Sequence, residues 1–313
     1  MCGEYDDAVA HFIAARDLQP AAAECHVALV RAASALALQD LESQALDAAL
    51  ALHPMQPELH LHAALRRVPA DPAAARAWLR PVLGHPPCAM FDAALSAIPG
   101  SQVPAPAADA DPRDVARVAA LRWVLAHSDA PDVHAGLPIA VLLRALETAP
   151  REGLTLECGV YFGRSLRVIA AHTHGVTHGF DSFQGLPEAW SEREGAGAYS
   201  TAGRLPKVPG DVALHPGWFQ DTLPPFLAAN PEPVRLLHID CDIYGSTRTV
   251  LEHVAPRLAP GSVIVFDDFL GYPGYEAHEL RAFEEFAARS GIGWELVAAC
   301  LMGREVAIRI TTT

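Results

Sequence analysis

The chain has 313 residues, of which 51% are hydrophobic and 19% charged, so its composition predicts a globular protein long enough for two domains. Its formal net charge of -14 disfavours nucleic acid and anionic membrane as partners, because both are bound through clustered Lys and Arg. The six cysteines form no CxxC pair, so zinc and thioredoxin chemistry are unsupported. Without a recognisable signal peptide or long apolar run, we expect a soluble, cytoplasmic protein.

Residues 1–90 are rich in Ala and Leu with a helical period, and Pro20 and Pro54 lie one tetratricopeptide period apart. Small and aromatic residues fall where the second half of such a repeat places them, at Ala8, Phe12 and Ala15. Small residues let paired helices approach, and Pro ends the second helix. The pattern resembles tetratricopeptide repeats that begin in mid-repeat, as in a truncated chain, and repeats of this kind bind protein partners. The alternative is a generic Ala-rich helical domain.

Residues 91–112 are rich in Pro, Ala and Asp, which is typical of a linker. Two helices are expected after it, over 113–127 and 137–149. A domain boundary at the linker would let a polypeptide starting near Pro112 fold and keep its ligand without the preceding residues.

From residue 153 onward, strand and helix patterns alternate, which predicts a mostly parallel sheet with helices on both faces. The expected strands are 154–158, 176–181, 211–215, 234–240, 261–267, 294–299 and 305–310. The expected helices are 164–173, 222–229, 246–257 and 276–290. Only residues 300–304 separate the last two strands, so these should form an antiparallel hairpin. Ligands of such sheets bind at the carboxyl ends of the strands.

A glycine turn follows the first of these strands. Glu157 ends an apolar run, Gly159 and Gly163 follow, and a helical pattern begins near Ser165. A strand, a tight turn and a helix start let a ligand lie against bare backbone, with helix amide groups directed at any anionic part. A dinucleotide-binding turn is the alternative, but its closer glycine triplet is missing here.

Carboxylates recur at later strand ends, at Asp181, Asp240 and the pair Asp267–Asp268. Carboxylates that converge at neighbouring strand ends repel one another, and hard oxygen ligands suit Mg²⁺ or Ca²⁺. Asp242 competes with Asp240 as a ligand, and Asp240 is preferred because it ends the apolar run. Two alternatives remain: these acids cap helices, or residues 240–242 form the DxD motif of a glycosyltransferase.

Residues 153–313 resemble class I S-adenosylmethionine-dependent methyltransferases, and more closely the macrocin O-methyltransferase (TylF-type) family. Five motifs in order carry the resemblance: residues 157–165 (ECGVYFGRS), 179–187 (GFDSFQGLP), 217–224 (GWFQDTLP), 238–244 (HIDCDIY) and 265–269 (VFDDF). The resemblance implies a Rossmann-like α/β domain over 113–313, with seven strands in one sheet and an antiparallel hairpin at its C-terminal end. The preceding all-α region is not part of the match.

The family likeness also implies roles for individual residues. Cofactor-binding positions would be Glu157, Gly159, Tyr161, Gly163, Ser165, Asp181, Ser182, Gln220 and Asp221. Ser165 would meet the methionine carboxylate of S-adenosylmethionine, Glu157 its ammonium group and Asp181 the ribose. For Asp181 the alternative is a cap on the following turn. Gln220 and Asp221 would lie beside the adenine, unless this segment only starts a helix.

A divalent metal, usually magnesium, would be held by Asp240, Asp267 and Asp268. Asp240 is also a candidate general base, because a metal-bound hydroxyl is more acidic. His278 is the second candidate, since its ordinary pKa suits neutral pH, although a histidine in a loop can also be plain surface. Catechol-type relatives have Lys three residues after the first metal Asp, where Ile243 stands here, which disfavours a catechol acceptor.

The leading hypothesis is a magnesium-dependent O-methyltransferase that acts on a hydroxyl, on a sugar of a glycosylated metabolite or glycan. The alternative is an interaction module of helical repeats fused to a cofactor-binding domain of weak activity. A homodimer is compatible with either. The glycine-rich residues 184–210 are predicted to close over the site or to be a disordered insertion.

Overall fold

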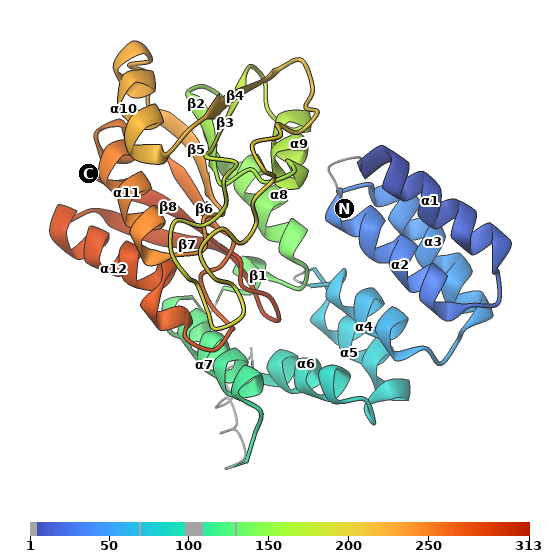
Figure 1. Cartoon of the computed structure of the whole chain (residues 1–313). Helices are drawn as coiled ribbons and strands as arrows, with labels where there is room; N and C mark the ends of the chain where they lie inside the picture. The colour runs from blue at the N-terminus through green and yellow to red at the C-terminus, as the bar shows by residue number, and fades with distance from the viewer. Residues whose placement is uncertain (1–4, 69, 98–108, 129) are drawn as a thin grey trace.

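The computed structural model describes residues 5–68, 70–97, 109–128 and 130–313 (Figure 1). The described N-terminal residues form a helical layer beside a sheet. We call helices α1–α6 the helical region and residues 109–313 the sheet region. The helical region consists of α1 (Tyr5–Leu18), α2 (Ala23–Ala35), α3 (Gln39–Leu52), α4 (Pro57–Leu65), α5 (Pro72–Leu79), η1 (Arg80–Val82) and α6 (Pro86–Ala97).

Proline and aspartate fix several helix starts. Pro57 and Pro72 occupy the first turns of α4 and α5, where a missing N–H costs nothing. Asp71 caps α5 by accepting a hydrogen bond from the Ala74 amide at 2.8 Å. The helical character of residues 1–90 is thus confirmed where they are described. Their likeness to tetratricopeptide repeats stays a prediction.

The predicted linker over 91–112 needs a correction. Residues 91–97 belong to α6, because their Ala-rich composition continues the helix and Phe91 is fully buried. At the other end, α7 (Pro112–His127) begins one residue earlier than predicted, with Asp111 as its cap. Residues 98–108 lie outside the described part of the chain.

The sheet region contains eight strands within the described residues, in the order β1-β7-β8-β6-β5-β2-β3-β4. They are β1 (His134–Ala135), β2 (Leu154–Cys158), β3 (Thr177–Asp181), β4 (Val212–Pro216), β5 (Val234–Ile239), β6 (Val263–Phe266), β7 (Gly293–Cys300) and β8 (Val306–Thr312). Strand β8 is antiparallel to both of its neighbours, which confirms the predicted hairpin. The predicted count of seven is wrong here, because the short β1 pairs with β7 at the sheet edge.

Helices cover both faces of the sheet. They are α8 (Pro138–Thr148), α9 (Arg164–Ala171), α10 (Phe219–Ala229), α11 (Tyr244–Val254) and α12 (Glu279–Ser290), with short turns η2 (Pro131–Val133), η3 (Ala255–Arg257) and η4 (Tyr275–Ala277). Successive strand residues point to opposite faces: Leu236 packs in the cluster under α8 and α9, and Leu237 in the cluster under α10–α12. Among the described helices, none is long and apolar enough to cross a membrane.

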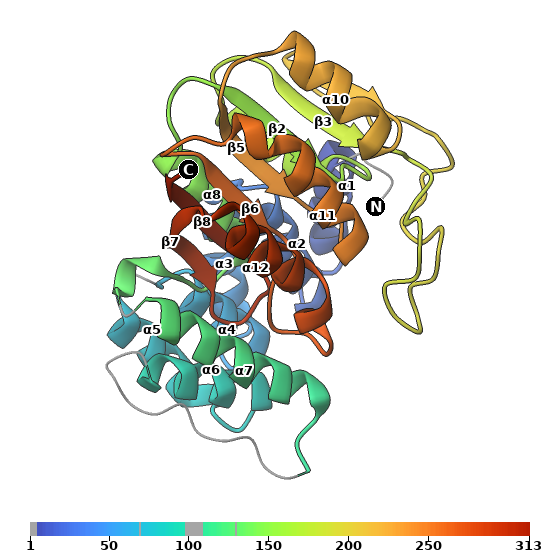
Figure 2. The same cartoon turned by 90° about the vertical axis from the view of Figure 1, so that its left-hand side faces the viewer.

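The two regions share one hydrophobic core. Leu79 and Phe91 of the helical region belong to the same buried cluster as α7 and the sheet face under α10–α12. Figure 2 shows α4–α7 gathered at one end of the sheet region. Backbone contact is also close, because a Cβ on Gly136 would lie 2.1 Å from the Leu65 carbonyl oxygen. The helical region is therefore packed against the sheet region, which argues against the independent folding expected from the linker.

Candidate active site

A cavity of about 390 Å³ lies at the carboxyl ends of β2, β3, β5 and β6. The parallel strands end together there, which is where open α/β sheets bind ligands. Its lining brings together several predicted residues: Gly159, Tyr161, Ser165, Asp181, Ser182, Asp240, Asp267 and Asp268. It also includes residues that the sequence did not single out: Trp190, Tyr199, Trp218, Phe219 and Arg304.

The glycine turn after β2 forms one wall. Gly159 has φ +95°, and a Cβ there would lie 1.6 Å from the Asp240 carbonyl oxygen, so only glycine fits against the end of β5. Gly163 differs, because its Cβ would meet nothing closer than Pro206 at 3.5 Å, and its φ of +77° alone favours glycine. Tyr161 lies between them in the left-handed region as well, with φ 51°. Backbone strain of this kind is concentrated at functional sites.

Asp181 holds this turn in place. Its Oδ2 accepts hydrogen bonds from the amides of Val160 and Tyr161, both at 2.8 Å, and its Oδ1 accepts one from the Phe183 amide at 2.7 Å. The last of these bonds is the one that a cap on the following turn would make, which was the alternative interpretation of Asp181. Ser182, beside it in the cavity, accepts from the Gln184 amide at 3.1 Å.

The segment after β4 lines the cavity with different residues from those predicted. Gly217, Trp218 and Phe219 face it, whereas Gln220 and Asp221 lie outside the lining, exposed in the first turn of α10. A helix start turns successive side chains by about 100° each, so a shift of one or two positions changes the residue that faces the cavity. The motif was found, but its cavity-facing residues were missed.

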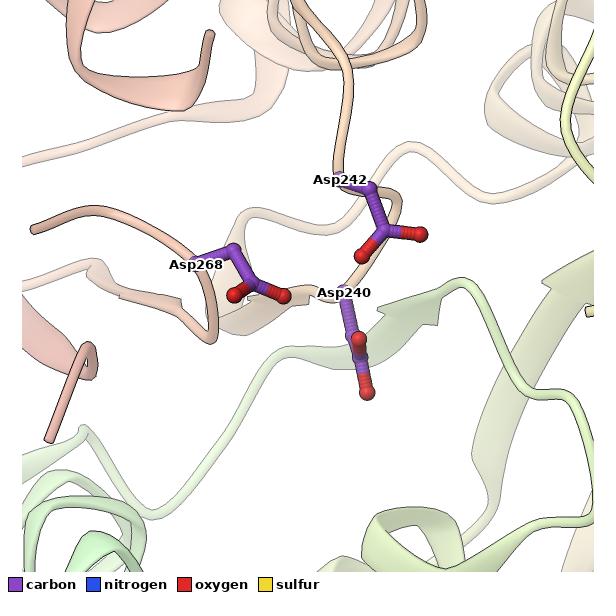
Figure 3. Close-up of side chains that lie close together, drawn as sticks. All are labelled: Asp240, Asp242 and Asp268. Atoms are coloured by element: carbon purple, nitrogen blue, oxygen red, sulfur yellow. The ribbon is translucent and has the colours of Figure 1, made fainter. Parts of the chain in front are cut away.

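Three carboxylates gather on the loops after β5 and β6. Asp240, Asp242 and Asp268 each offer an oxygen, and these oxygens lie within 4.8 Å of one another (Figure 3). Asp242 joins the group because the chain turns sharply there, with φ 63°, a conformation that Asp tolerates better than most residues. Asp267, predicted as a ligand, lines the same cavity but does not belong to this group.

Burial and mutual repulsion disfavour the ionised form of these carboxylates. Burial, followed by repulsion from Asp267 and Asp242, raises the pKa of Asp240 well above its ordinary value. Burial and the neighbouring Asp268 raise the pKa of Asp242 to about 8. The pKa of Asp268 is also raised by burial and by Asp267, with partial relief from Arg304. A hard divalent cation would relieve this repulsion, so the donor set fits Mg²⁺ or Ca²⁺.

Arg304 is a cation at this edge of the cavity, and sequence reasoning missed it. It comes from the turn between β7 and β8, and its guanidinium donates a hydrogen bond to Asp268. The same guanidinium lies 4.7 Å from the ring centre of Tyr272 and 5.5 Å from that of Trp190. The hairpin therefore connects the acid group to the aromatic wall of the cavity.

Glu157 and Asp267 are linked behind the cavity by His238. Glu157 is fully buried, does not line the cavity, and its Oε1 lies 2.9 Å from His238 Nδ1. On the other side of the ring, His238 Nε2 lies 3.8 Å from Asp267 Oδ1. The second oxygen of Glu157 has no hydrogen-bond partner among the described residues. His238 thus couples the end of β2 to the end of β6.

The two candidate bases occupy different places. Asp240 lines the cavity within the acid group. His278 does not line it, and its ring centre lies 6.3 Å from that of Tyr272 and 6.5 Å from that of Trp190. Burial lowers the pKa of His278. Of the two candidates, Asp240 alone is thus in the cavity lining.

Residues 184–210 form an ordered loop that contributes to the cavity wall. The Leu186 amide donates to the Ala198 carbonyl at 2.9 Å, and the Trp190 amide donates to the Glu194 carbonyl at 2.8 Å. These bonds place Trp190 and Tyr199 in the lining. Burial raises the pKa of Tyr199 to about 12. The loop is thus no disordered insertion, and its aromatic residues within a glycine-rich stretch were the available signal.

Comparison with known proteins agrees with this geometry. A family model described as a methyltransferase domain matches residues 156–269, from β2 to the acid group. The mycinamicin III 3''-O-methyltransferase of Micromonospora griseorubida is 30% identical over 189 residues, which cover 50% of this chain and 70% of that protein. The chain belongs to the S-adenosylmethionine-dependent O-methyltransferases. S-Adenosylmethionine is accordingly the methyl donor of this methyltransferase.

Three further matches of this methyltransferase cover a shorter stretch or have a lower identity. The 8-demethyl-8-(2,3-dimethoxy-alpha-L-rhamnosyl)-tetracenomycin-C 4'-O-methyltransferase of Streptomyces olivaceus is 30% identical over 151 residues, 40% of this chain and 57% of that protein. Among solved structures, the calicheamicin methyltransferase CalS11 is 23% identical to this chain with a TM-score of 0.43. The match covers 55% of this chain and 76% of the CalS11 chain. The O-methyltransferase NovP has the same identity and TM-score, covering 60% and 83%.

Proposed function

We propose that this methyltransferase methylates a hydroxyl group on a sugar, carried by a glycosylated metabolite or a glycan, with the help of a bound divalent cation, Mg²⁺. The observation that carries the proposal is the group of Asp240, Asp242 and Asp268, within 4.8 Å of one another in the same cavity as the glycine turn. The names of the two relatives support a hydroxyl acceptor, since both are O-methyltransferases, and the rhamnosyl group in the second name supports a sugar.

The cofactor is proposed to lie along the cavity between the glycine turn and the segment after β4. Asp181 and Ser182 stand between these two ends and would meet the ribose, while Gly217–Phe219 would face the adenine. At the other end, Ser165 in the first turn of α9 would meet the methionine carboxylate, favoured by the free amides of a helix start. Glu157 is proposed to act on the ammonium group only at a distance, because it does not line the cavity.

Asp240, Asp242 and Asp268 would hold the cation, and Asp267 is the further carboxylate within the lining. A divalent cation held there would stabilise negative charge on the acceptor oxygen. Asp240 is the proposed proton acceptor, since it reaches the cavity and His278 does not. Trp190 and Tyr199 would exclude water from the acceptor and present apolar faces to a sugar ring.

The decisive experiment is a methyl-transfer assay with labelled S-adenosylmethionine over a panel of sugar glycosides and simple phenols. Metal-stripped protein should be inactive, Mg²⁺ should restore activity, and glycosides should be preferred. Asp268→Asn should lower turnover by orders of magnitude, while Asp211→Asn, an exposed acid before β4, should not. Full activity in EDTA would refute the metal role. Cofactor binding without methylation of any acceptor would favour the alternative, an interaction module with weak activity.

A protein partner of the helical region, a homodimer and a cytoplasmic location remain predictions. The homodimer can be tested by measuring the mass of the purified chain in light scattering.

A further inference from the structure

A second cavity, of about 280 Å³, lies between the helical region and the sheet region. Its walls come from α2 and α4 on one side and from the starts of α8 and α9 on the other. Arg164, Ser165 and Asp267 line both this cavity and the larger one. The two cavities therefore adjoin at the start of α9, where the methionine end of the cofactor is proposed to lie.

The polar lining of this second cavity is made mainly of hydrogen-bond donors. The helical region contributes Arg31, Ser34 and His62, and the sheet region contributes Arg164, Ser165 and His238. Asp267 is the one carboxylate among the described residues that line it. Although the chain has a formal net charge of -14, the lining of this cavity contains two guanidinium groups and one carboxylate. Such a lining suits an anionic group accompanied by a cationic one.

His62 and Arg31 differ in what they can offer a ligand. His62 Nε2 lies 2.5 Å from Glu42 Oε1, so that nitrogen is engaged within the helical region. Arg31 is exposed at the end of α2, and no ion pair involves it among the described residues. A guanidinium without a carboxylate at the rim of a cavity can reach an anion in it without losing another bond. Arg31 is therefore the charged contact that the helical region can give.

We propose that the methionine end of S-adenosylmethionine extends into the second cavity and that Arg31 pairs with its carboxylate. The inference rests on the proposed placement of the cofactor, whose only anionic group is this carboxylate. Asp267 would meet the neighbouring ammonium group, and the apolar side chains of Leu137 and Leu142 would flank the methylene part. The helical region, which lies outside the matched methyltransferase model, thereby completes the cofactor site.

Two ligands that differ only in the amino-acid end test this inference. S-Adenosylhomocysteine carries the carboxylate, and 5'-methylthioadenosine has the same nucleoside without it. For Arg31→Gln in the full chain, calorimetry should show S-adenosylhomocysteine bound about tenfold more weakly, as expected for one charge-assisted bond. The affinity for 5'-methylthioadenosine should not change, and Arg31→Lys should recover part of the loss. Arg16→Gln is the matched control, because Arg16 pairs with Asp17 on α1.

Other results would overturn the inference. Unchanged S-adenosylhomocysteine affinity in Arg31→Gln would remove Arg31 from the cofactor site, and an accompanying rise in acceptor KM would assign the cavity to the acceptor. Equal weakening of both ligands would indicate a structural effect instead of a contact with the carboxylate. If the unmodified protein bound neither ligand, the proposed position of the cofactor would be wrong. That outcome differs from normal binding by the unmodified protein together with unchanged affinity in Arg31→Gln.

Discussion

Glu42 of the helical region and the group of Asp240, Asp242 and Asp268 of the sheet region differ in how their buried charge is balanced. Glu42, 5% exposed in the helical region, lies 2.5 Å from His62 and 3.5 Å from Arg66, so its charge is balanced by neighbours of the same region. In the sheet region, the ion pair made by the group of Asp240, Asp242 and Asp268 among the described residues is that of Asp268 with Arg304. Uncompensated buried charge is costly. The comparison therefore distinguishes an acid with a structural partner from acids that are available to bind a ligand.

The broadest test of this comparison is to separate the two regions. A polypeptide of residues 112–313 lacks Leu79 and Phe91 of the shared core and the contact at Gly136, so we expect it to lose cooperative folding. Circular dichroism melts and gel filtration measure this. A polypeptide starting at Pro20 loses only α1, which packs in a separate cluster, and should remain folded. An unchanged melting temperature for 112–313 would show that the regions are independent.

Asp242→Asn should separate activity from stability. Turnover should fall by about 100-fold or more, since the variant removes a charged ligand at a place that Asn also tolerates with positive φ. In EDTA, the same variant should be more stable than the original protein, because one repelling carboxylate is gone. Steady-state kinetics and urea unfolding measure the two effects. A variant that is both inactive and less stable without metal would contradict the view of these acids as an unbalanced group.

The pH dependence of stability is a second test of the unfavourable ionisation of Asp242. The pKa of Asp242 is raised from 3.8 to about 8, so the folded state holds a proton where the unfolded state has lost it. Its stabilising contribution is therefore fully present below about pH 4 and is lost as pH rises toward 8. In EDTA, the free energy of unfolding should fall more steeply over this window in the original protein than in Asp242→Asn. Parallel curves would argue against the shift.

Glu42→Gln should act in the opposite sense on stability. It leaves His62 and Arg66 without their buried partner, so we expect a loss of about 3 kcal/mol in the free energy of unfolding. The exposed Glu24→Gln in the first turn of α2 is the control and should change little. Urea unfolding monitored by circular dichroism gives both values. A stabilised Glu42→Gln would mean that the helical region, too, carries a destabilising acid.

The smallest expected effect concerns the contact between the regions. A Cβ on Gly136 would meet the Leu65 carbonyl at 2.1 Å, and this backbone atom cannot move aside easily. We expect Gly136→Ala to lower the free energy of unfolding by about 1–3 kcal/mol. Gly84→Ala, with nothing within 4 Å of its Cβ, should be neutral or slightly stabilising. Equal unfolding curves for the two variants would indicate that the regions are not tightly packed at Gly136.

Most of the sheet was predictable because its strands are apolar and bounded by polar residues. The strands ending at Ile239 and Phe266 were expected within a few residues of their observed bounds. The two residues of β1 show no periodicity, so only the pairing with β7 reveals them. The Pro, Ala and Asp content of residues 91–112 suggested a linker, but residues 91–97 continue a helix in which Phe91 is fully buried. Tertiary packing here overrides local composition.

The sequence could predict only those site residues that lie at the ends of strands. Asp181, Asp240 and Asp268 follow strands and therefore reach one cavity. Asp242 could not be placed by strand alternation, because the chain leaves the strand and turns there with φ 63°. Arg304 lies 36 residues from Asp268, and no local pattern indicates their contact. Side chains that meet through tertiary structure have no signature in a single sequence.

Because Arg304 lies against Trp190, changes at the acid group can be followed by tryptophan fluorescence. The Arg304 guanidinium contacts Asp268 on one side and lies 5.5 Å from the Trp190 ring on the other. Indole emission responds to a nearby positive charge, so a cation that displaces Arg304 from Asp268 would alter the fluorescence of Trp190. The loop from residue 184 to 210 thus contains a natural probe of occupancy, and a titration can be followed without label or substrate.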